Sequence, residues 1–247
     1  GVKPNDDYFK VQWNLIAVHL PEAWEEVRKR TAFSPPVRIA IVDTGVCREH
    51  EDLDDDELWD GPASMRASSP FNPFICDFSS FAVDERHHGT RVASVLAAIT
   101  NNHKGMAGAF WDPAGNASIQ LVSARVFDER GQATIERVAG AINRLVQDPE
   151  PPDIINISLG LREKIDSQAL RNAIQGAYNA GILIVAAAGN DERFVTYPAA
   201  YREVLAVGAT NRYDDRASWS GRGSELDLMA PGVDVLVAMG RSDYRAG

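Results

Sequence analysis

The chain has 247 residues, of which 45% are hydrophobic and 24% are charged. This composition predicts one compact globular domain over residues 1–247. The formal net charge of -10 argues against a nucleic-acid groove, which needs clustered Lys and Arg to neutralise phosphates. The longest apolar runs, such as residues 182–189, fall short of the roughly 20 residues that a membrane-spanning helix needs.

The first predicted elements are a helix and a strand. Residues 21–30, PEAWEEVRKR, place a proline in the first turn, glutamates early and basic residues last, which predicts a surface helix. Residues 37–42, VRIAIV, form an apolar run typical of a central parallel strand. Asp43 follows at the carboxyl end of this strand, where open α/β sheets bind ligands, although DTG also suits an ordinary turn.

Two cysteines, Cys47 and Cys76, lie after this strand. They are too few for a scaffold built on disulfides, and the sequence allows either one bridge or two free buried thiols. Residues 51–84 begin with an acidic run and continue in a segment rich in proline and serine. We expect a surface loop there.

A histidine pair stands at the start of the next predicted helix, in RHHGTRVASVLAA at residues 86–98. Val92, Val95, Leu96 and Ile99 recur at helical offsets, and the alanines between them permit close packing against a sheet. We therefore expect a buried helix with its N-terminus at a cleft. A histidine at that point can act as a general base at neutral pH, or it can cap the helix without any chemistry.

The rest of the chain alternates between strands and helices. The expected strands span residues 119–127, 154–157, 182–187, 204–208 and 235–238, and the expected helices span residues 135–146 and 167–180. Ser167 is the expected N-cap of the last helix, and Gly181 lies just past its end. The alternation predicts an α/β fold, in which residues 204–208 and 235–238 complete one doubly wound and largely parallel sheet between helices.

Five separated segments make the chain resemble the subtilisin-like serine proteases. They are IVDTGV at 41–46, HGTRVA at 88–93, NISLG at 156–160, AAAGN at 186–190 and MAPGVDV at 229–235. One segment would be weak evidence, but all five occur in the family's order and on the expected elements. The resemblance covers almost the whole chain and implies an endopeptidase that cleaves peptide bonds through an acyl-enzyme.

The resemblance assigns catalytic roles to individual residues. Asp43 matches the family's triad aspartate and His88 its general base, while His87 is only the neighbour. A serine hydroxyl is a poor nucleophile until an imidazole takes its proton and a carboxylate holds that imidazole in the right tautomer. Asn190 matches the asparagine whose amide stabilises the oxyanion, although a Gly-Asn pair alone also suits a turn.

The resemblance also implies a cleft in which an extended peptide adds as a strand between two walls. One wall consists of Ser158, Leu159 and Gly160, and the facing strand of Gly131, Gln132 and Ala133. The pocket for the residue before the cut is bordered by Ala187, Ala188 and Gly189, with Thr196 near its base. No particular cleavage specificity follows from these residues.

A structural calcium ion is implied by PNDDYF at 4–9 and ITNNHKGMAG at 99–108, which resemble the calcium-binding regions of the thermitase-like branch. Six oxygens are enough for Ca²⁺. They come from the side chains of Asp6, Asp52 and Asn102 and from the carbonyls of Ile99, Lys104 and Met106. An acidic surface beside an ordinary Asn-rich turn is the alternative.

The family's nucleophilic serine lies in a GTS segment that follows the final strands, and the sequence stops at YRAG, just before that point. Ser158 lies in the cleft wall, and Ser218 and Ser220 precede the MAPG motif, so none of them matches. We therefore expect the serine in a segment beyond Gly247 or in a second chain, with the domain incomplete at its C-terminus. A noncatalytic peptide-binding protein and a truncated inactive fragment are the alternatives.

The resemblance further implies a peptide or protein substrate, an inhibitory pro-segment removed when a zymogen is processed, and a secreted or extracytoplasmic location. The first residues, GVKPNDDYF, do not identify a compartment, and an intracellular location stays open. A metal site on the two adjacent histidines is a further idea, but no third ligand at a suitable spacing is visible.

Overall fold

The computed structural model describes residues 1–29, 36–53, 76, 87–114, 119–161 and 164–247. Its centre is a six-stranded sheet in the order β2-β1-β3-β4-β5-β6, in which all neighbouring strands are parallel. The strands span Val37–Asp43 (β1), Ile119–Arg125 (β2), Ile154–Ile157 (β3), Leu183–Ala187 (β4), Leu205–Thr210 (β5) and Leu228–Pro231 (β6). The predicted α/β class with a largely parallel sheet is confirmed.

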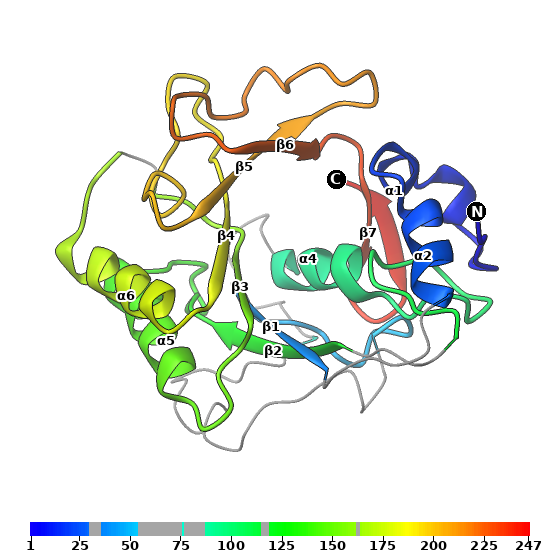
Figure 1. Cartoon of the computed structure of the whole chain (residues 1–247), viewed down its shortest axis with the longest axis horizontal. Helices are drawn as coiled ribbons and strands as arrows, with labels where there is room; N and C mark the ends of the chain where they lie inside the picture. The colour runs from blue at the N-terminus through cyan, green and yellow to red at the C-terminus, as the bar shows by residue number, and fades with distance from the viewer. Residues whose placement is uncertain (30–35, 54–75, 77–86, 115–118, 162–163) are drawn as a thin grey trace.

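Helices lie on both faces of the sheet (Figure 1). Helices α5 (Ile135–Gln147) and α6 (Gln168–Asn179) lie side by side on one face, and α4 (His88–Ala97) lies on the other. Strand β1 shows how the sequence produces this arrangement. Ala40 and Val42 join the core that includes α5 and α6, whereas the alternate residues Ile39 and Ile41 join the core beneath α4. Because the period of a strand is two, one apolar run serves both faces.

Helices α5 and α6 bury the apolar stripes that their sequences present. Helix α5 packs Val138, Ile142 and Leu145 into the core. The Thr134 side chain caps it by accepting a hydrogen bond from the backbone N–H of Arg137 at 3.3 Å. Ser167 is the N-cap residue of α6, as predicted, but its side chain makes no capping bond.

Helix α4 buries its small residues rather than the larger apolar ones that revealed its periodicity. Ala93, Ser94 and Ala97 are buried, while Val92 and Leu96 are only partly covered. Small side chains on the buried face allow a close approach of neighbouring backbone. The helix also ends at Ala97, so Ile99 lies beyond it.

The N-terminal segment forms a short 3-10 helix, η1 (Phe9–Val11), and two helices, α1 (Trp13–Ala17) and α2 (Leu20–Arg28). Helix α2 is the surface helix predicted at residues 21–30, although residue 30 lies outside the described part. It buries Trp24, whose indole N–H donates to the Ala109 carbonyl at 2.9 Å. The N-terminal segment is thereby attached to the loop that follows α4.

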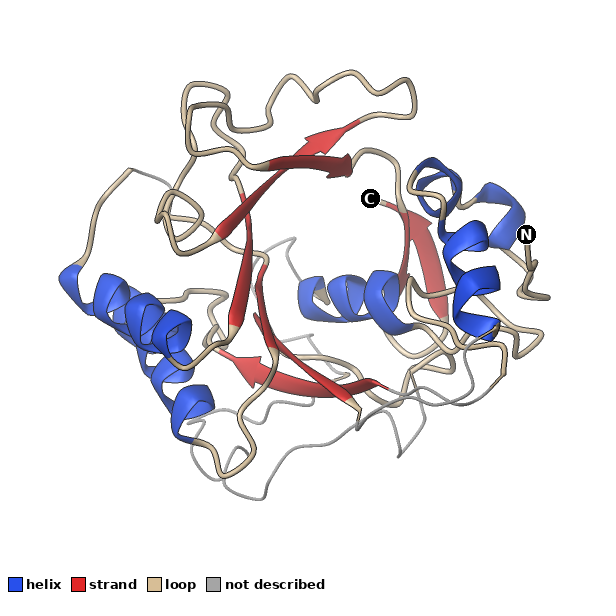
Figure 2. Cartoon of the chain, in the orientation of Figure 1, coloured by secondary structure: helices blue, strands red, loops and turns tan. Residues whose placement is uncertain are grey.

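The prediction that residues 235–238 complete the main sheet is wrong. Strand β7 (Leu236–Met239) instead forms an antiparallel hairpin with β8 (Asp243–Ala246), and β6 is the sixth strand of the sheet. A parallel crossover needs about a dozen residues or more, which the short link between β6 and β7 does not provide. The hairpin packs on α4, where the backbone N–H of Ala238 donates to Ser94 Oγ at 3.0 Å. Figure 2 shows it apart from the central strands.

Most of the loop predicted at residues 51–84 lies outside the described residues. Within the described part of the chain, no helix is both long and apolar enough to cross a membrane.

Replacing Ile142 by alanine should lower the free energy of unfolding by about 2–5 kcal/mol, because this side chain is fully buried between α5 and the sheet. Urea unfolding followed by circular dichroism measures the effect. Ile165→Ala is the matched control, since Ile165 is exposed and its loss should change stability by less than about 0.5 kcal/mol. Equal decreases in the free energy of unfolding of the two variants would contradict the placement of Ile142 in the core.

Candidate active site

Asp43 owes its position to the alternation of side chains along β1. Ile39 and Ile41 pack toward α4, and Asp43 follows them at the same period of two. Its side chain is 1% exposed. A buried carboxylate needs hydrogen-bond donors, and the backbone N–H of Thr44 is one of them, at 2.7 Å.

His88, the first residue of α4, supplies another donor. Its Nδ1 lies 2.9 Å from both carboxylate oxygens of Asp43. An ionised carboxylate can only accept hydrogen bonds, so Nδ1 carries the proton and Nε2 is the basic nitrogen of the neutral ring. The imidazole is 37% exposed. This pair, the dyad, is a base held in one tautomer by a buried acid.

Two reciprocal hydrogen bonds fasten the start of α4 to the turn after β1. The backbone N–H of Gly89 donates to Thr44 Oγ1, and the backbone N–H of Cys47 donates to Thr90 Oγ1, both at 2.9 Å. Gly89 also lies so close to Gly45 that a Cβ there would be 2.3 Å from the Gly45 carbonyl oxygen. Sequence reasoning missed these contacts, although the Thr-Gly pair of DTG and the Gly-Thr pair of HGT were visible signals.

Cys47 and Cys76 form a disulfide, which decides between the two states that the sequence left open. Cys47 is fully buried, whereas Cys76 is partly exposed. The bond therefore attaches a partly exposed residue to the buried turn beside the dyad.

The strand register aligns the predicted cleft wall with Asp43. Val42 of β1 is opposite Ile157 of β3, and Ile157 is opposite Ala186 of β4. Asp43, Ser158 and Ala187 each follow these residues by one position, so they lie next to one another at the carboxyl ends of the three strands. Adjacent strands lie about 4.8 Å apart, so this arrangement brings the wall and the pocket border close to the dyad.

Thr196 connects the predicted wall to the predicted pocket border. A Cβ at Gly160 would lie 2.5 Å from Thr196 Oγ1, and one at Gly189 would lie 2.4 Å from the same atom. The backbone N–H of Thr196 donates to the Ala188 carbonyl at 3.0 Å. Gly160, Gly189 and Thr196 thus come together, with the partly buried Leu159 packed on the adjacent core.

Gly131, Gln132 and Ala133 form a loop, and in the described structure they belong to no strand. Asp128 holds this loop, because its carboxylate accepts from the backbone N–H of Gln132 and its own N–H donates to the Gln132 carbonyl, both at 2.9 Å. The bond from Gln132 is the main reason that the pKa of Asp128 is lowered. The backbone N–H of Gly131 also donates within the loop, to the Asp128 carbonyl at 3.0 Å.

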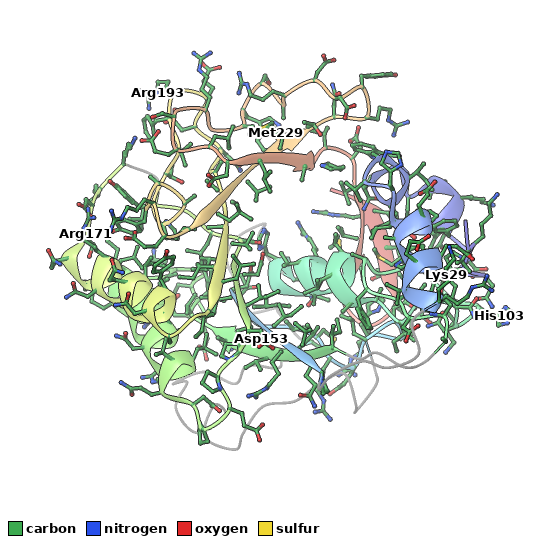
Figure 3. All side chains as sticks on the ribbon, viewed as in Figure 1. Lys29, His103, Asp153, Arg171, Arg193 and Met229 are labelled. Carbon is green, nitrogen blue, oxygen red and sulfur yellow. A yellow bond between two sulfur atoms is a disulfide. The ribbon has the colours of Figure 1, made fainter. Side chains whose placement is uncertain are left out.

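Asn190 lies exposed in the bend after β4, and its amide forms no hydrogen bond with a described residue. The next residue, Asp191, is paired with Arg193, whose side chain lowers the pKa of Asp191 to about 2. Arg193 projects from the outer surface of the molecule (Figure 3). The Asp191 carboxylate is thus engaged by Arg193 rather than by the Asn190 amide.

Three residues predicted to bind calcium come together from separate segments. The Asp6 carboxylate accepts from the backbone N–H of Asn101 at 2.9 and 3.0 Å, and Asp52 Oδ2 accepts from that of Met106 at 2.7 Å. Asn102 turns its amide nitrogen, not the predicted ligand oxygen, toward Asp52 Oδ1 at 3.0 Å.

The two carboxylates of this cluster are buried, and neither pairs with a described Lys or Arg. Burial raises the pKa of Asp6, and the charge of Asp52 adds to the rise. Ile99 and Lys104 lie alongside, with their N–H groups bonded to the Asp52 carbonyl and to Asn102 Oδ1. Two buried carboxylates without a basic partner in the described part of the chain are a donor set that a hard cation can use. Because no three described His, Cys, Asp or Glu side chains form a metal group, a cation here would depend on main-chain oxygens.

Tyr244 of β8 is a member of this cluster that sequence reasoning missed. Its hydroxyl lies 2.8 Å from Asp52 Oδ2 and 3.1 Å from Glu51 Oε1, and its ring packs edge-on against His50. Burial raises the pKa of Tyr244. No signal in the sequence placed the end of the chain beside residues 50–52.

Comparisons with known proteins agree with this geometry. The model of the subtilase family matches residues 35–246. The chain is 34% identical to the thermophilic serine proteinase of Bacillus sp. (strain AK1), with 98% of the chain and 54% of that protein covered. It is also 34% identical to thermitase of Thermoactinomyces vulgaris, with 98% and 77% covered. The chain thus spans about half of the first relative and three quarters of the second.

A solved protease structure from Pseudoalteromonas arctica PAMC 21717 has the same fold. It superposes with a TM-score of 0.77 at 27% identity, over 100% of this chain and 82% of the other. The likeness therefore extends over every part of the chain that forms the candidate site.

Replacing Gly89 by alanine should lower the free energy of unfolding by about 1–3 kcal/mol, because the new methyl group would collide with the Gly45 carbonyl and force the start of α4 away from β1. Urea unfolding measures this. Gly140→Ala in α5 is the control, since nothing lies within 4 Å of a Cβ there. The free energy of unfolding of this variant should rise by about 0.5–1 kcal/mol, because alanine has the higher helix propensity. A gain of stability in both variants would show that the close approach is not a constraint.

Proposed function

Because the chain belongs to the subtilase family, we propose that it supplies the general base, the orienting carboxylate and the oxyanion amide of a serine endopeptidase. The observation that carries this proposal is the hydrogen bond from His88 Nδ1 to the buried Asp43. A protein that only bound peptides would gain nothing from a base held in one tautomer.

In the proposed reaction, His88 Nε2 takes the proton of the serine hydroxyl while that oxygen attacks the substrate carbonyl carbon. Asp43 stays ionised and stabilises the imidazolium, which then protonates the leaving amine. The Asn190 amide donates to the oxygen on which negative charge develops. Water hydrolyses the resulting acyl-enzyme by the same proton route in reverse.

The serine comes from a segment that follows Gly247 in the full-length protein or from a second chain. A peptide or protein substrate lies between the wall at Ser158–Gly160 and the loop at residues 131–133, with the side chain before the cut near Thr196. The order of Asp43, Ser158 and Ala187 along the sheet edge supports this placement. An inhibitory pro-segment would occupy the same cleft before processing of the zymogen.

The Cys47–Cys76 disulfide supports a secreted or extracytoplasmic location, because disulfides persist in oxidising compartments.

In the full-length protein, His88→Ala should lower kcat for peptide hydrolysis by about 10⁶-fold. Asn190→Ala should lower kcat by about 100 to 1,000-fold, the magnitude established for the oxyanion asparagine of subtilisin, with little change in KM. His103→Ala is the control, since this histidine is exposed and bonded to Asn5 at the surface. Wild-type turnover in His88→Ala would refute the proposed chemistry.

We also propose that calcium binds at Asp6, Asp52 and Asn102, with the carbonyls of Ile99, Lys104 and Met106. The ion would offset the repulsion between the two buried carboxylates and join the N-terminal segment to the loop after α4. The observation in favour is the burial of both carboxylates without a basic partner among the described residues.

Chelation of calcium with excess EGTA should lower the unfolding temperature by about 5–10 °C, as expected for a ligand held at about 100 times its Kd. Thermal unfolding with and without added calcium measures the shift. Asp6→Asn should remove most of the calcium dependence, whereas Asp7→Asn, which changes an exposed neighbour, should keep it. An unfolding temperature that does not change on addition of EGTA would contradict the proposed calcium site.

A further inference from the structure

The Cys47–Cys76 disulfide connects directly to the hydrogen bonds that hold the dyad. Cys47 ends the turn that begins at Thr44, and its backbone N–H donates to Thr90 Oγ1 in the first turn of α4. At the other end of this turn, Thr44 bonds to Gly89 and to Asp43. Only this turn separates the disulfide from the bond between Asp43 and His88.

The disulfide also shortens the covalent path between the two members of the dyad. Asp43 and His88 are 45 residues apart in sequence. Cys47 lies four residues after Asp43, and Cys76 lies twelve residues before His88. Since the cost of bringing two chain segments together grows with the length between them, breaking the bond should disfavour the paired state by roughly fivefold.

We infer that this disulfide is a positioning element for the dyad, and that its reduction loosens the start of α4 and lowers turnover. The inference rests on the proposed function for its effect on hydrolysis, but its structural part concerns the bond between Asp43 and His88 alone. The partly exposed Cys76 is where a reductant would attack, because Cys47 is fully buried.

The reaction is an exchange with a dithiol. One thiolate of the dithiol attacks Cys76 Sγ, the bond to Cys47 breaks, and the Cys47 thiolate takes a proton. The second thiol then displaces Cys76 from the mixed disulfide. The protein gains two electrons and two protons as two thiols, and the dithiol becomes a disulfide.

The first test is nitrogen-15 NMR of histidine-labelled protein before and after treatment with dithiothreitol, with complete reduction verified by an increase of about 2 Da in intact mass. The oxidised protein should show His88 as the Nδ1–H tautomer, and the reduced protein should show a mixture of tautomers. The exposed His103 is the internal reference and should not change. The variant Cys76→Ala should resemble the reduced protein and be unaffected by dithiothreitol.

A separate hydrolysis assay on the full-length protein should show kcat falling by roughly fivefold or more on reduction, with KM changing less than twofold. If His88 keeps a single tautomer after complete reduction, the inference is wrong, whatever the assay shows. It is also wrong if amide exchange in α5 accelerates together with the change at His88, because the bond would then support the whole fold. Absence of hydrolysis in both redox states would instead refute the proposed function and leave the NMR result standing.

Discussion

The hydrogen bond between Asp43 and His88 joins the end of a strand to the start of a helix, 45 residues apart in sequence. The sheet fixes one partner, because Asp43 ends β1, which lies between β2 and β3. Packing fixes the other, because α4 presents small residues to the sheet and can approach it closely. Hydrogen bonds then join residues 44–47 to the start of α4, with Thr44 accepting from Gly89 and Cys47 donating to Thr90. Disturbing either element would separate the base from its acid.

An imidazole partner distinguishes Asp43 from the cluster of Asp6 and Asp52, since all three carboxylates are buried. Asp43 accepts hydrogen bonds from His88 and from the backbone N–H of Thr44. Asp6 and Asp52 share a neighbourhood without a described basic partner, so burial and mutual repulsion raise the pKa of Asp6. The first site is suited to holding a proton on a neighbouring imidazole. The second is the site at which we propose a cation, and the hairpin of β7 and β8 reaches it through Tyr244.

The sequence predicted most of the main sheet because its strands are apolar runs separated by helices with clear apolar stripes, as in α5. The family resemblance of the segments IVDTGV and HGTRVA singled out Asp43 and His88, and the structure brings their side chains within hydrogen-bond distance. The sequence analysis placed residues 235–238 in the wrong sheet, because an apolar run does not indicate which sheet a strand joins. Only the short link between β6 and β7 argues against parallel pairing of these two strands. Contacts between distant segments, such as Tyr244 with Asp52 or Cys47 with Thr90, could not be predicted, because they produce no periodic pattern in the sequence.

In the proposed mechanism, His88 activates a serine carried outside residues 1–247. Denaturing mass analysis of the full-length protein after treatment with a fluorophosphonate tests it most directly, because such probes react with an activated serine. We expect one adduct, located by peptide mapping in the segment after Gly247 or in a separate chain, and absent from the His88→Ala variant. An adduct on a serine within residues 1–247, or an adduct that forms equally in His88→Ala, would contradict it.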